Sequence, residues 1–486
     1  MGVAWDVMVI GAGASGLSAA RAAAAEGASR VALVERDGRL GGECLYTGCV
    51  PSKALIEAAR RFRDARQGER FGLHASDVRL DFGQVMAYVG GVIADIGRDD
   101  AAETLSEAGI EVLTGVARFT GIRELQVDGA SHTFEKAVVA TGSDALIPGG
   151  LGLESVPHLT NDTVFDLEAL PARLAVLGGG PLGLELGQAF AHFGSEVTIM
   201  ELLDQLLQRE DPRAGQVVHE ALLADGVDVR LSTKATGVTQ ERGGVRIRVE
   251  GPDGQGDVDA DALLVAVGRR PRSDGFGLRQ IGVAIEEGRV VVDERMRTSV
   301  DGIYACGDVT GGFQFTHVGA YEGVIAGRNA AGKKQKADYR VVPWVTFTDP
   351  EVGRVGLTEE EARREHSKVE VTEIPMSRID RARVSGRTRG FVKLITAGRP
   401  ILGRLGGGMV VGAQVVGPCA GEILHEAVLA MQTKCFSGRL AQAIHAYPTG
   451  SMGLQMAALQ LFPIGRALVP PDELPPVPGA SPRDAH

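Results

Sequence analysis

Two cysteines lie five residues apart, Cys44 and Cys49, in the segment LGGECLYTGCVPSK at residues 40–53. The residues that follow, 51–61, are typical of a helix, so both thiols lie at or just before a helix N-terminus. The helix dipole favours thiolate there, and a close thiol pair can cycle between dithiol and disulfide. Two other interpretations remain: half of a metal site, which would lack nearby ligands, or two inert buried thiols.

The residues ahead of the cysteines predict a dinucleotide site. They form a βαβ unit made of a strand at 6–10, the turn GAGASG at 11–16, a helix at 17–26 and a strand at 30–34. In such a unit Gly11 permits the tight turn, Gly13 lets the backbone approach a pyrophosphate, and Gly16 lets helix and strand pack closely. The helix N-terminus offers N–H groups to phosphate, and Glu35 can bind a ribose diol.

A second unit of this kind begins 167 residues later. It consists of a strand at 174–177, the turn GGGPLG at 178–183, a helix at 184–193 and a strand at 196–200. The strand is followed by Glu201, an acid that favours the 2′-hydroxyl of NAD and repels a 2′-phosphate. No Arg occupies residues 202–207, so the sequence predicts a preference for NADH.

Three apolar runs predict further buried strands, at residues 136–143, 262–271 and 302–308. The last ends at Asp308, whose carboxylate could bind a ribityl hydroxyl. From residue 343 the pattern changes to that of a separate α+β domain. Its predicted strands lie at 345–347, 369–374, 390–395 and 409–416, and its predicted helices at 421–431 and 437–444.

Composition limits the possible functions. The chain has 486 residues, a net charge of −11, 44% hydrophobic and 5% aromatic residues, which disfavours disorder and non-specific nucleic-acid binding. Neither a membrane span nor a signal peptide is predicted, and the few cysteines favour a reducing cytoplasm. Cys306, Cys419 and Cys435 are interpreted as buried small hydrophobes.

Together these motifs resemble the FAD-dependent pyridine nucleotide–disulfide oxidoreductases, and among them mercuric reductase and dihydrolipoamide dehydrogenase. The resemblance spans about residues 4–466. Besides the cysteine segment and both glycine turns, it rests on residues 140–142, 267–271, 305–308, 347–353 and 416–422.

The resemblance implies an α/β fold of the glutathione-reductase type, with two Rossmann-like domains for FAD and NAD and a C-terminal α+β dimerisation domain. The implied boundaries are 1–147 and 270–340 for FAD, 148–269 for NAD(P) and 341–467 for dimerisation; the prolines and polar residues of 468–486 predict a disordered tail. The resemblance further implies a homodimer with an active site shared across the interface and a small-molecule acceptor, whereas the charge and hydropathy of the chain predict no nucleic-acid or membrane partner.

The resemblance also assigns roles to residues. Cys49 would be the thiol next to the flavin, Cys44 the outer thiol, and Lys53 with Glu185 an ion pair beside the flavin. The implied FAD-binding residues are Gly11, Gly13, Ala14, Ser15, Gly16, Glu35, Arg36, Gly42, Lys53, Ala117, Thr141, Gly142, Ser143, Asp308 and Thr316. The implied NAD-binding residues are Gly178, Gly180, Pro181, Leu182, Gly183, Glu201, Ala235 and Gly268. No resident metal is implied.

The segment at residues 443–452, AIHAYPTGSM, departs from the family pattern. Dihydrolipoamide dehydrogenases carry a His that serves as acid–base, followed by a Glu that orients it; Tyr447 and Met452 occupy those positions. A Tyr is a poor base at neutral pH because its ordinary pKa is about 10. His445 is a candidate substitute that would share a face with Tyr447 if this stretch were extended.

The leading hypothesis is therefore a mercuric-reductase-like enzyme that passes electrons from NADH through FAD and the Cys44–Cys49 pair. The acceptor would be a small disulfide, a quinone-like compound or a thiophilic metal ion, with Tyr447 facing the outer thiol. The first alternative is a dihydrolipoamide dehydrogenase that uses His445 as its base. The second is a flavoprotein sensor or carrier with little turnover, supported only by the Pro-rich tail.

Overall fold

The computed structural model describes residues 5–398 and 405–468, which fall into two compact units. The first unit comprises residues 1–171 and 264–338, and the second comprises residues 172–263 and 339–486. The chain returns from the second unit to the first within strand β14 (Ala262–Val265).

The first unit is built on a mixed sheet. Its strands are β1 (Trp5–Ile10), β2 (Val31–Glu35), β3 (Ile110–Thr114), β4 (Ala117–Gly121), β5 (Glu124–Val127), β6 (Ala130–Val139), β7 (Ser143–Ala145), β15 (Arg269–Pro271), β16 (Ile285–Glu286), β17 (Arg289–Val290) and β18 (Ile303–Ala305). Its helices are α1 (Ala14–Ala25), α2 (Gly42–Tyr46), α3 (Cys49–Arg66), α4 (Phe82–Gly97), α5 (Ala102–Glu107) and α8 (Thr316–Ala330). The sheet order is β3-β2-β1-β6-β5-β4, and β18 also pairs with β6.

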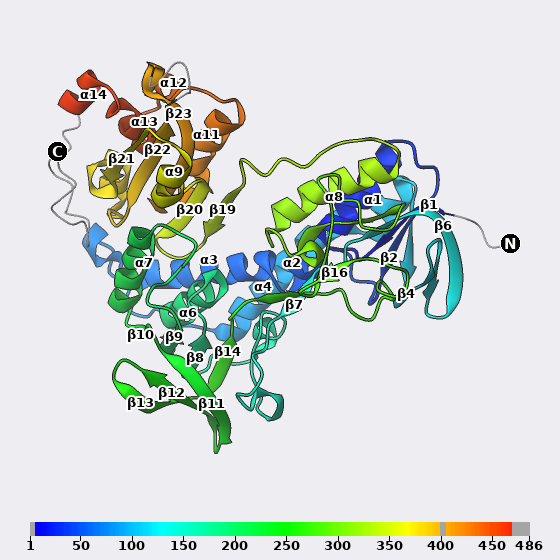
Figure 1. The fold of residues 1–486 in the computed structure, drawn as a ribbon. Helices are drawn as coiled ribbons and strands as arrows, with labels where there is room; N and C mark the ends of the chain where they lie inside the picture. The colour runs from blue at the N-terminus through cyan, green and yellow to red at the C-terminus, as the bar shows by residue number, and fades with distance from the viewer. Residues whose placement is uncertain (1–4, 399–404, 469–486) are drawn as a thin grey trace. The chain divides into compact units, whose positions relative to one another are not determined.

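Strand β1 is central because it is apolar and buried on both faces, as a parallel strand covered by helices should be. Val7 pairs with Val31 of β2 on one side and with Lys136 of β6 on the other, both in parallel register. Helices α1 and α8 lie side by side against this sheet (Figure 1). Their close approach requires glycine, since a Cβ on Gly327 would lie 2.1 Å from the carbonyl oxygen of Ala19.

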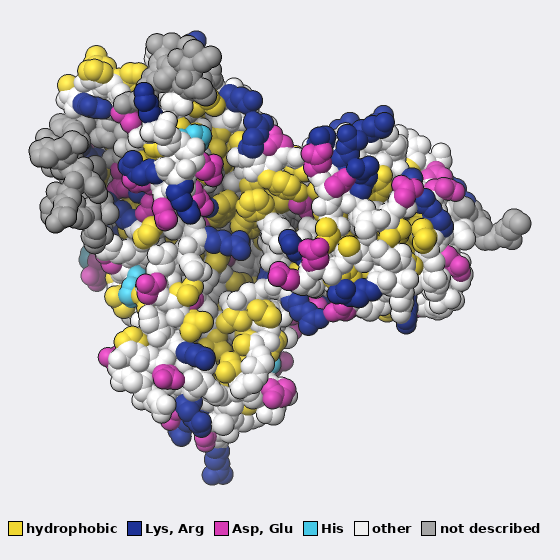
Figure 2. All heavy atoms as spheres, viewed as in Figure 1, with side chains coloured by type: hydrophobic (Ala, Val, Ile, Leu, Met, Phe, Trp, Pro, Cys, Tyr) yellow, Lys and Arg dark blue, Asp and Glu magenta, His cyan; other side chains and the backbone are white. Residues whose placement is uncertain are grey.

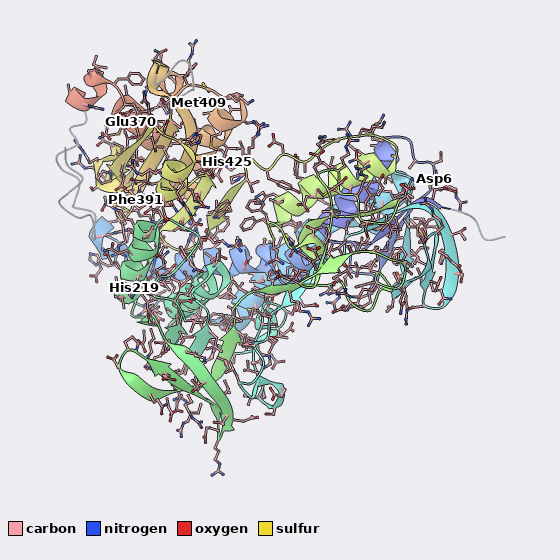
Figure 3. All side chains as sticks on the ribbon, in the orientation of Figure 1. Asp6, His219, Glu370, Phe391, Met409 and His425 are labelled. Atoms are coloured by element: carbon pink, nitrogen blue, oxygen red, sulfur yellow. The ribbon has the colours of Figure 1, made fainter. Side chains whose placement is uncertain are left out.

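The turn into β2 is fixed by a side chain rather than by backbone alone. Asp6, labelled in Figure 3, accepts hydrogen bonds from the backbone amides of Ser29 and Arg30 at 2.8 and 3.1 Å. These two bonds hold the start of β2 beside β1. Strand β2 ends at Glu35, whose carboxylate reaches the glycine turn.

The second unit contains three sheets. Its strands are β8 (Arg173–Leu177), β9 (Glu196–Met200), β10 (Asp228–Arg230), β11 (Lys234–Glu241), β12 (Gly244–Gly251), β13 (Gly254–Ala260), β19 (Pro343–Thr346), β20 (Glu351–Gly356), β21 (Val369–Pro375), β22 (Phe391–Ala397) and β23 (Met409–Gly417). Its helices are α6 (Pro181–Phe193), α7 (Pro212–Ala224), α9 (Glu359–Glu365), α10 (Asp380–Ser385), α11 (Ala420–Gln432), α12 (Ser437–Gln442), α13 (Met452–Leu459) and α14 (Pro463–Leu468).

Strands β8, β9 and β10 are parallel, as expected for a dinucleotide-binding unit, and β11, β12 and β13 form an antiparallel sheet. The C-terminal part is an antiparallel sheet of order β19-β20-β23-β22-β21. Helices α11 and α13 pack on it (Figure 1) and bury an apolar core with its strands.

Buried charges join α7 to this C-terminal sheet. Lys393 of β22 lies 2.6 Å from Asp211, which caps α7, and 3.5 Å from Glu373 of β21. Phe391 (Figure 3) lies beneath the charged groups of Arg213 and Lys393, at 5.2 and 5.6 Å from the ring centre. Such pairs fix geometry, because burying one charge without its partner is costly.

The structure confirms the α/β architecture with its C-terminal α+β domain. The predicted helix starts at residues 17 and 184 are wrong, because α1 begins at Ala14 and α6 at Pro181, inside the glycine turns. The four domain boundaries stay predictions; residues 148–171 belong to the first unit. The predicted tail, apart from Leu468, lies outside the described residues.

Surface charge is mixed: Lys and Arg side chains lie among Asp and Glu side chains over the face shown in Figure 2. None of the helices in the described residues has the length and apolarity needed to cross a bilayer.

Candidate active site

The cysteine segment is placed by two glycines. Gly41 has a φ of +110°, and a Cβ there would lie 2.4 Å from Leu45. Gly42 packs against the first glycine turn, where a Cβ would lie 2.5 Å from the Cα of Gly13. The backbone therefore brings α2, which carries Cys44, directly against the predicted phosphate site.

The two thiols interact but are not bonded to each other. Cys44 lies within α2 and Cys49 is the first residue of α3, with its sulfur 3.4 Å from the hydroxyl oxygen of Thr316. The neighbouring Cys49 thiol raises the pKa of Cys44, and burial adds to the rise. Cys49 instead lies at a helix N-terminus, where the dipole favours thiolate. The pair is thus electrostatically unequal.

The first glycine turn fits the diphosphate of FAD. Gly13 caps α1 without any side-chain hydrogen bond, so the first amides of the helix remain available for a phosphate. Gly16 must be glycine because a Cβ would lie 1.8 Å from the Gly11 carbonyl oxygen. Glu35 accepts hydrogen bonds from the amides of Ala12 and Arg36 at 2.8 and 2.9 Å, which orders the turn.

The other predicted FAD residues of this unit have different surroundings. Ser143 donates to the carboxylate of Asp308 at 2.5 Å, whereas Thr141 donates to the carbonyl oxygen of Arg272 at 2.6 Å. Gly142 has a φ of +75° and Ala117 is buried in the core at the start of β4. The structure thus brings Ser143 and Asp308 together, while the Thr141 hydroxyl bonds to the protein backbone.

The second glycine turn has the same design in the second unit. Gly180 caps α6 without a side-chain bond, Pro181 begins the helix, and a Cβ on Gly183 would lie 2.2 Å from the Gly178 carbonyl oxygen. Glu201 accepts hydrogen bonds from the amides of Gly179 and Leu203 at 2.6 and 2.9 Å. These contacts hold its carboxylate at the turn, where a nicotinamide dinucleotide fits.

The remaining predicted nucleotide residues are divided between the units. Leu182 follows Pro181 in α6, and Ala235 lies in β11 of the second unit. Gly268, in the first unit, has a φ of +144°, and its carbonyl oxygen accepts a hydrogen bond from the Leu146 amide at 2.9 Å.

Lys53 and Glu185 also belong to different units. The Lys53 ammonium donates to the Ser52 hydroxyl at 3.3 Å, and the buried Glu185 carboxylate accepts from the Phe347 amide at 2.8 Å. Their ion pair beside the flavin stays a prediction.

The sequence analysis missed Glu43. Its carboxylate accepts hydrogen bonds from Asn161 at 2.7 Å and from the Arg269 guanidinium. Burial raises the pKa of Glu43, and Arg269 opposes the rise. The only available signal was an acidic residue directly before Cys44; its partners lie 118 and 226 residues away in the sequence.

The sequence predicts a shared face for His445 and Tyr447 only if this stretch is extended, and residues 443–449 form no strand. The His445 side chain is only 5% exposed; its Nε2 lies 2.9 Å from Glu426 of α11, and its Nδ1 lies 3.0 Å from the Ala443 carbonyl oxygen. Tyr447 is 70% exposed and donates to Asp380 of α10 at 2.9 Å.

These contacts change what each residue can do. Both nitrogens of His445 already lie against acceptors, the Glu426 carboxylate and the Ala443 carbonyl oxygen, so these contacts hold the ring in place. The Asp380 carboxylate raises the pKa of Tyr447, so its phenol remains neutral. Met452 begins α13.

The other cysteines differ from one another. Cys306 is fully buried as predicted, and burial raises the pKa of its thiol. Cys419 is exposed, which the prediction had wrong, because it caps α11 with a φ of +56°. Cys435 is partly buried.

Comparison with known proteins agrees with this geometry. Residues 5–323 match the family model described as pyridine nucleotide-disulphide oxidoreductase, and residues 342–458 match the dimerisation domain of that family. A dihydrolipoyl dehydrogenase of Thermus scotoductus is 38% identical over 93% of this chain and 96% of that protein. A mercuric reductase of Bacillus cereus is 33% identical over 94% of this chain and 71% of that protein.

A solved structure is similar over nearly the whole fold. The HOCl-induced flavoprotein disulfide reductase RclA from Escherichia coli gives a TM-score of 0.82 at 29% identity, covering 93% of this chain and 99% of that chain.

Proposed function

The chain belongs to the pyridine nucleotide–disulphide oxidoreductase family, and we propose that it is an NADH-dependent FAD enzyme whose acceptor site differs from that of lipoamide-reducing relatives. One observation carries the proposal: the thiol pair is present, whereas an exposed tyrosine, Tyr447, stands in the place of the family's acid–base histidine. Bound FAD would supply the two-electron chemistry between the nicotinamide and the thiols.

The residues of the first unit would hold the FAD. The free amides at the start of α1 bind the diphosphate, Glu35 binds the ribose, and Asp308 with Ser143 binds the ribityl chain. Cys49, at the start of α3, is the thiolate next to the flavin, and Cys44 is the thiol that meets the acceptor. Glu201 selects NADH because a carboxylate repels the 2′-phosphate of NADPH.

A homodimer would bring Tyr447 to the partner's Cys44. In support, Tyr447, Ile444 and Leu429 present large, well-exposed side chains on α11 and the segment after α12. Exposed apolar side chains of this kind are typical of subunit interfaces. The match of residues 342–458 to the family's dimerisation domain also supports a homodimer.

Tyr447 is suited to acceptors that need no base. Its phenol donates to Asp380, so its oxygen can accept a hydrogen bond from the Cys44 thiol but cannot remove the proton. A small disulfide with a good leaving group, a quinone or a thiophilic metal ion would therefore be reduced in preference to lipoamide.

An acceptor panel tests this proposal. The purified, FAD-loaded protein is assayed with NADH and lipoamide, an aromatic disulfide, a quinone and Hg(II) in turn. The proposal expects kcat/KM for at least one of the other acceptors to exceed that for lipoamide by about 100-fold, or about 2.7 kcal/mol. Lipoamide as the preferred acceptor would reject it.

The second candidate is a dihydrolipoamide dehydrogenase with a displaced base. The His445–Glu426 pair favours it, because a histidine oriented by a carboxylate is the usual acid–base arrangement. It predicts that His445→Ala abolishes lipoamide turnover while Tyr447→Phe preserves it. The leading proposal predicts the reverse: Tyr447→Phe lowers acceptor turnover, and His445→Ala preserves it.

The hypothesis that the protein is a flavoprotein sensor or carrier with little turnover has less support. It predicts negligible turnover with every acceptor in the panel, together with a protein partner that is lost when residues 468–486 are removed.

A further inference from the structure

A carboxylate is built into the helix that carries the outer cysteine. Glu43 directly precedes Cys44 in α2, and both of its oxygens are engaged, one by Asn161 and one by Arg269. Asn161 is itself buried, so this is a fixed contact rather than a surface one. The redox activity proposed above uses none of these three side chains.

Arg269 continues the network toward the predicted ribityl site. Its Nε donates to the Ser143 hydroxyl at 2.8 Å and lies 3.5 Å from the Asp308 carboxylate. Glu43, Arg269 and Asp308 therefore form a carboxylate–guanidinium–carboxylate bridge. Two negative groups share one positive group, which leaves one net negative charge in the bridge.

A second contact anchors the other end of α2. Thr47 donates to the Asp162 carboxylate at 3.0 Å, and the Asn161 amide donates to the same oxygen at 3.1 Å. The short helix is thus held at Glu43 by an amide and a guanidinium and at Thr47 by the Asp162 carboxylate. Cys44 lies between Glu43 and Thr47 in the sequence, whereas Cys49 is the first residue of the long helix α3.

We propose that Glu43 is a positioning residue that sets the reduction potential of the Cys44–Cys49 couple. Reduction breaks the S–S bond, takes up two electrons and one proton, and leaves one thiol and one thiolate. The site therefore gains one negative charge on reduction. A fixed carboxylate on the adjacent residue opposes that charge, so Glu43 makes the disulfide harder to reduce.

The inference rests on the proposed redox function of the pair, but its test does not require NADH. The full-length, FAD-loaded protein is equilibrated with reduced and oxidised dithiothreitol at about pH 8, where an ordinary Glu is charged. The reagent supplies two electrons and two protons per disulfide opened; one proton stays on the protein thiol, and the other is released to the buffer because the second sulfur is left as a thiolate. Free thiols are then alkylated, and the Cys44–Cys49 peptides are quantified by mass spectrometry.

Glu43→Gln keeps the shape of the side chain and removes its charge. The expected result is a roughly tenfold higher ratio of dithiol to disulfide in a given buffer, about 30 mV for a two-electron couple. Arg269→Gln removes the positive charge and is expected to lower the ratio. An unchanged ratio in both variants, with flavin content preserved, would overturn the inference.

Two variants separate charge from fold. Glu43→Asp keeps the charge and is expected to stay within about threefold of the unmodified chain. Asp144→Asn breaks a different carboxylate–arginine pair, between Asp144 of β7 and Arg272 directly after β15, and is expected to leave the ratio unchanged. A shift as large in Asp144→Asn as in Glu43→Gln would show a structural effect and contradict the inference. If NADH reduced no variant while the dithiothreitol ratios still shifted, the proposed function would fail and this inference would stand.

Discussion

The two segments that a disulfide reductase brings to its redox site differ in how far they follow the family pattern. Residues 40–53 carry the thiol pair, the close glycine contact with the phosphate turn and the helix start expected of a flavin-facing cysteine. Residues 443–452 lack the usual acid–base pair, and the histidine they contain is held by Glu426. In the proposed enzyme, the segment that receives electrons from the flavin thus follows the family pattern, and the segment proposed to meet the acceptor departs from it.

The difference follows from what each side must do. Accepting electrons from a bound flavin depends on one fixed geometry, which glycine contacts and a helix N-terminus supply. Acceptors vary in size, charge and need for a proton. An exposed tyrosine bonded to Asp380 presents an oxygen without presenting a base. The predictions below test this contrast.

The largest effect is expected at the outer thiol. Cys44→Ser should lower turnover with any disulfide acceptor by about 10³-fold or more, because no mixed disulfide can form. Reduction of the flavin by NADH should remain within about threefold, since the nucleotide sites do not include Cys44. Stopped-flow reduction and steady-state assays of the same preparation measure both. Equal losses in the two assays would contradict the contrast between the sides.

The next effect concerns the nucleotide. The unmodified chain should use NADH with a kcat/KM about 10–100 times that for NADPH, equivalent to roughly 1.4–2.7 kcal/mol. Glu201→Gln should reduce that ratio at least about tenfold, because the amide keeps the shape but does not repel a 2′-phosphate. Initial rates with both nucleotides measure the ratio. A higher kcat/KM for NADPH in the unmodified chain would reject the assignment of Glu201.

A smaller effect is expected at the acceptor side. Tyr447→Phe should lower acceptor turnover by about tenfold and leave the rate of flavin reduction by NADH unchanged. Tyr321→Phe is a matched control, since Tyr321 is another exposed tyrosine, whose hydroxyl accepts a hydrogen bond from the Asp338 amide. Equal effects of the two substitutions would argue against a specific role for Tyr447.

The smallest kinetic effect is expected at His445. His445→Gln should change acceptor turnover by less than about threefold, because its ring is enclosed between Glu426 and a carbonyl. It should instead lower the free energy of unfolding by about 1–3 kcal/mol, as loss of a buried charged hydrogen bond does. Denaturant unfolding and steady-state assays separate the outcomes. Large kinetic loss with unchanged stability would favour the displaced-base candidate.

A pH titration tests whether the Asp380 carboxylate raises the pKa of Tyr447. Because this carboxylate raises the pKa of Tyr447, phenolate should form at higher pH than the ordinary value of about 10. Asp380→Asn should move the midpoint back toward that value, since a neutral amide does not oppose phenolate formation. The phenolate absorbance of each form, minus that of its Tyr447→Phe counterpart, measures the midpoint. A midpoint unaffected by Asp380→Asn would contradict the bond.

The sequence predicted the local parts of the site well and the distant contacts poorly. Both glycine turns and the helix after Cys49 follow from spacing and backbone sterics within about ten residues. The helices begin inside the turns, which places the N-terminal amides of α1 and α6 at the predicted phosphate sites.

The missed features depend on tertiary contacts. Glu43 is paired with Arg269, which lies far along the chain, and His445 with Glu426 on α11. A shared face for His445 and Tyr447 was expected only for an extended stretch, and this stretch is not a strand. A spacing pattern predicts a residue's direction only once its secondary structure is known.

Anaerobic titration of the FAD-loaded protein with NADH shows whether the thiol pair receives electrons from the flavin. We expect uptake of two electrons with the long-wavelength absorbance of a thiolate beside oxidised flavin, and loss of that absorbance in Cys49→Ser. Absence of the band in the unmodified chain, with Cys44 and Cys49 intact by thiol counting, would contradict electron transfer from the flavin to this pair.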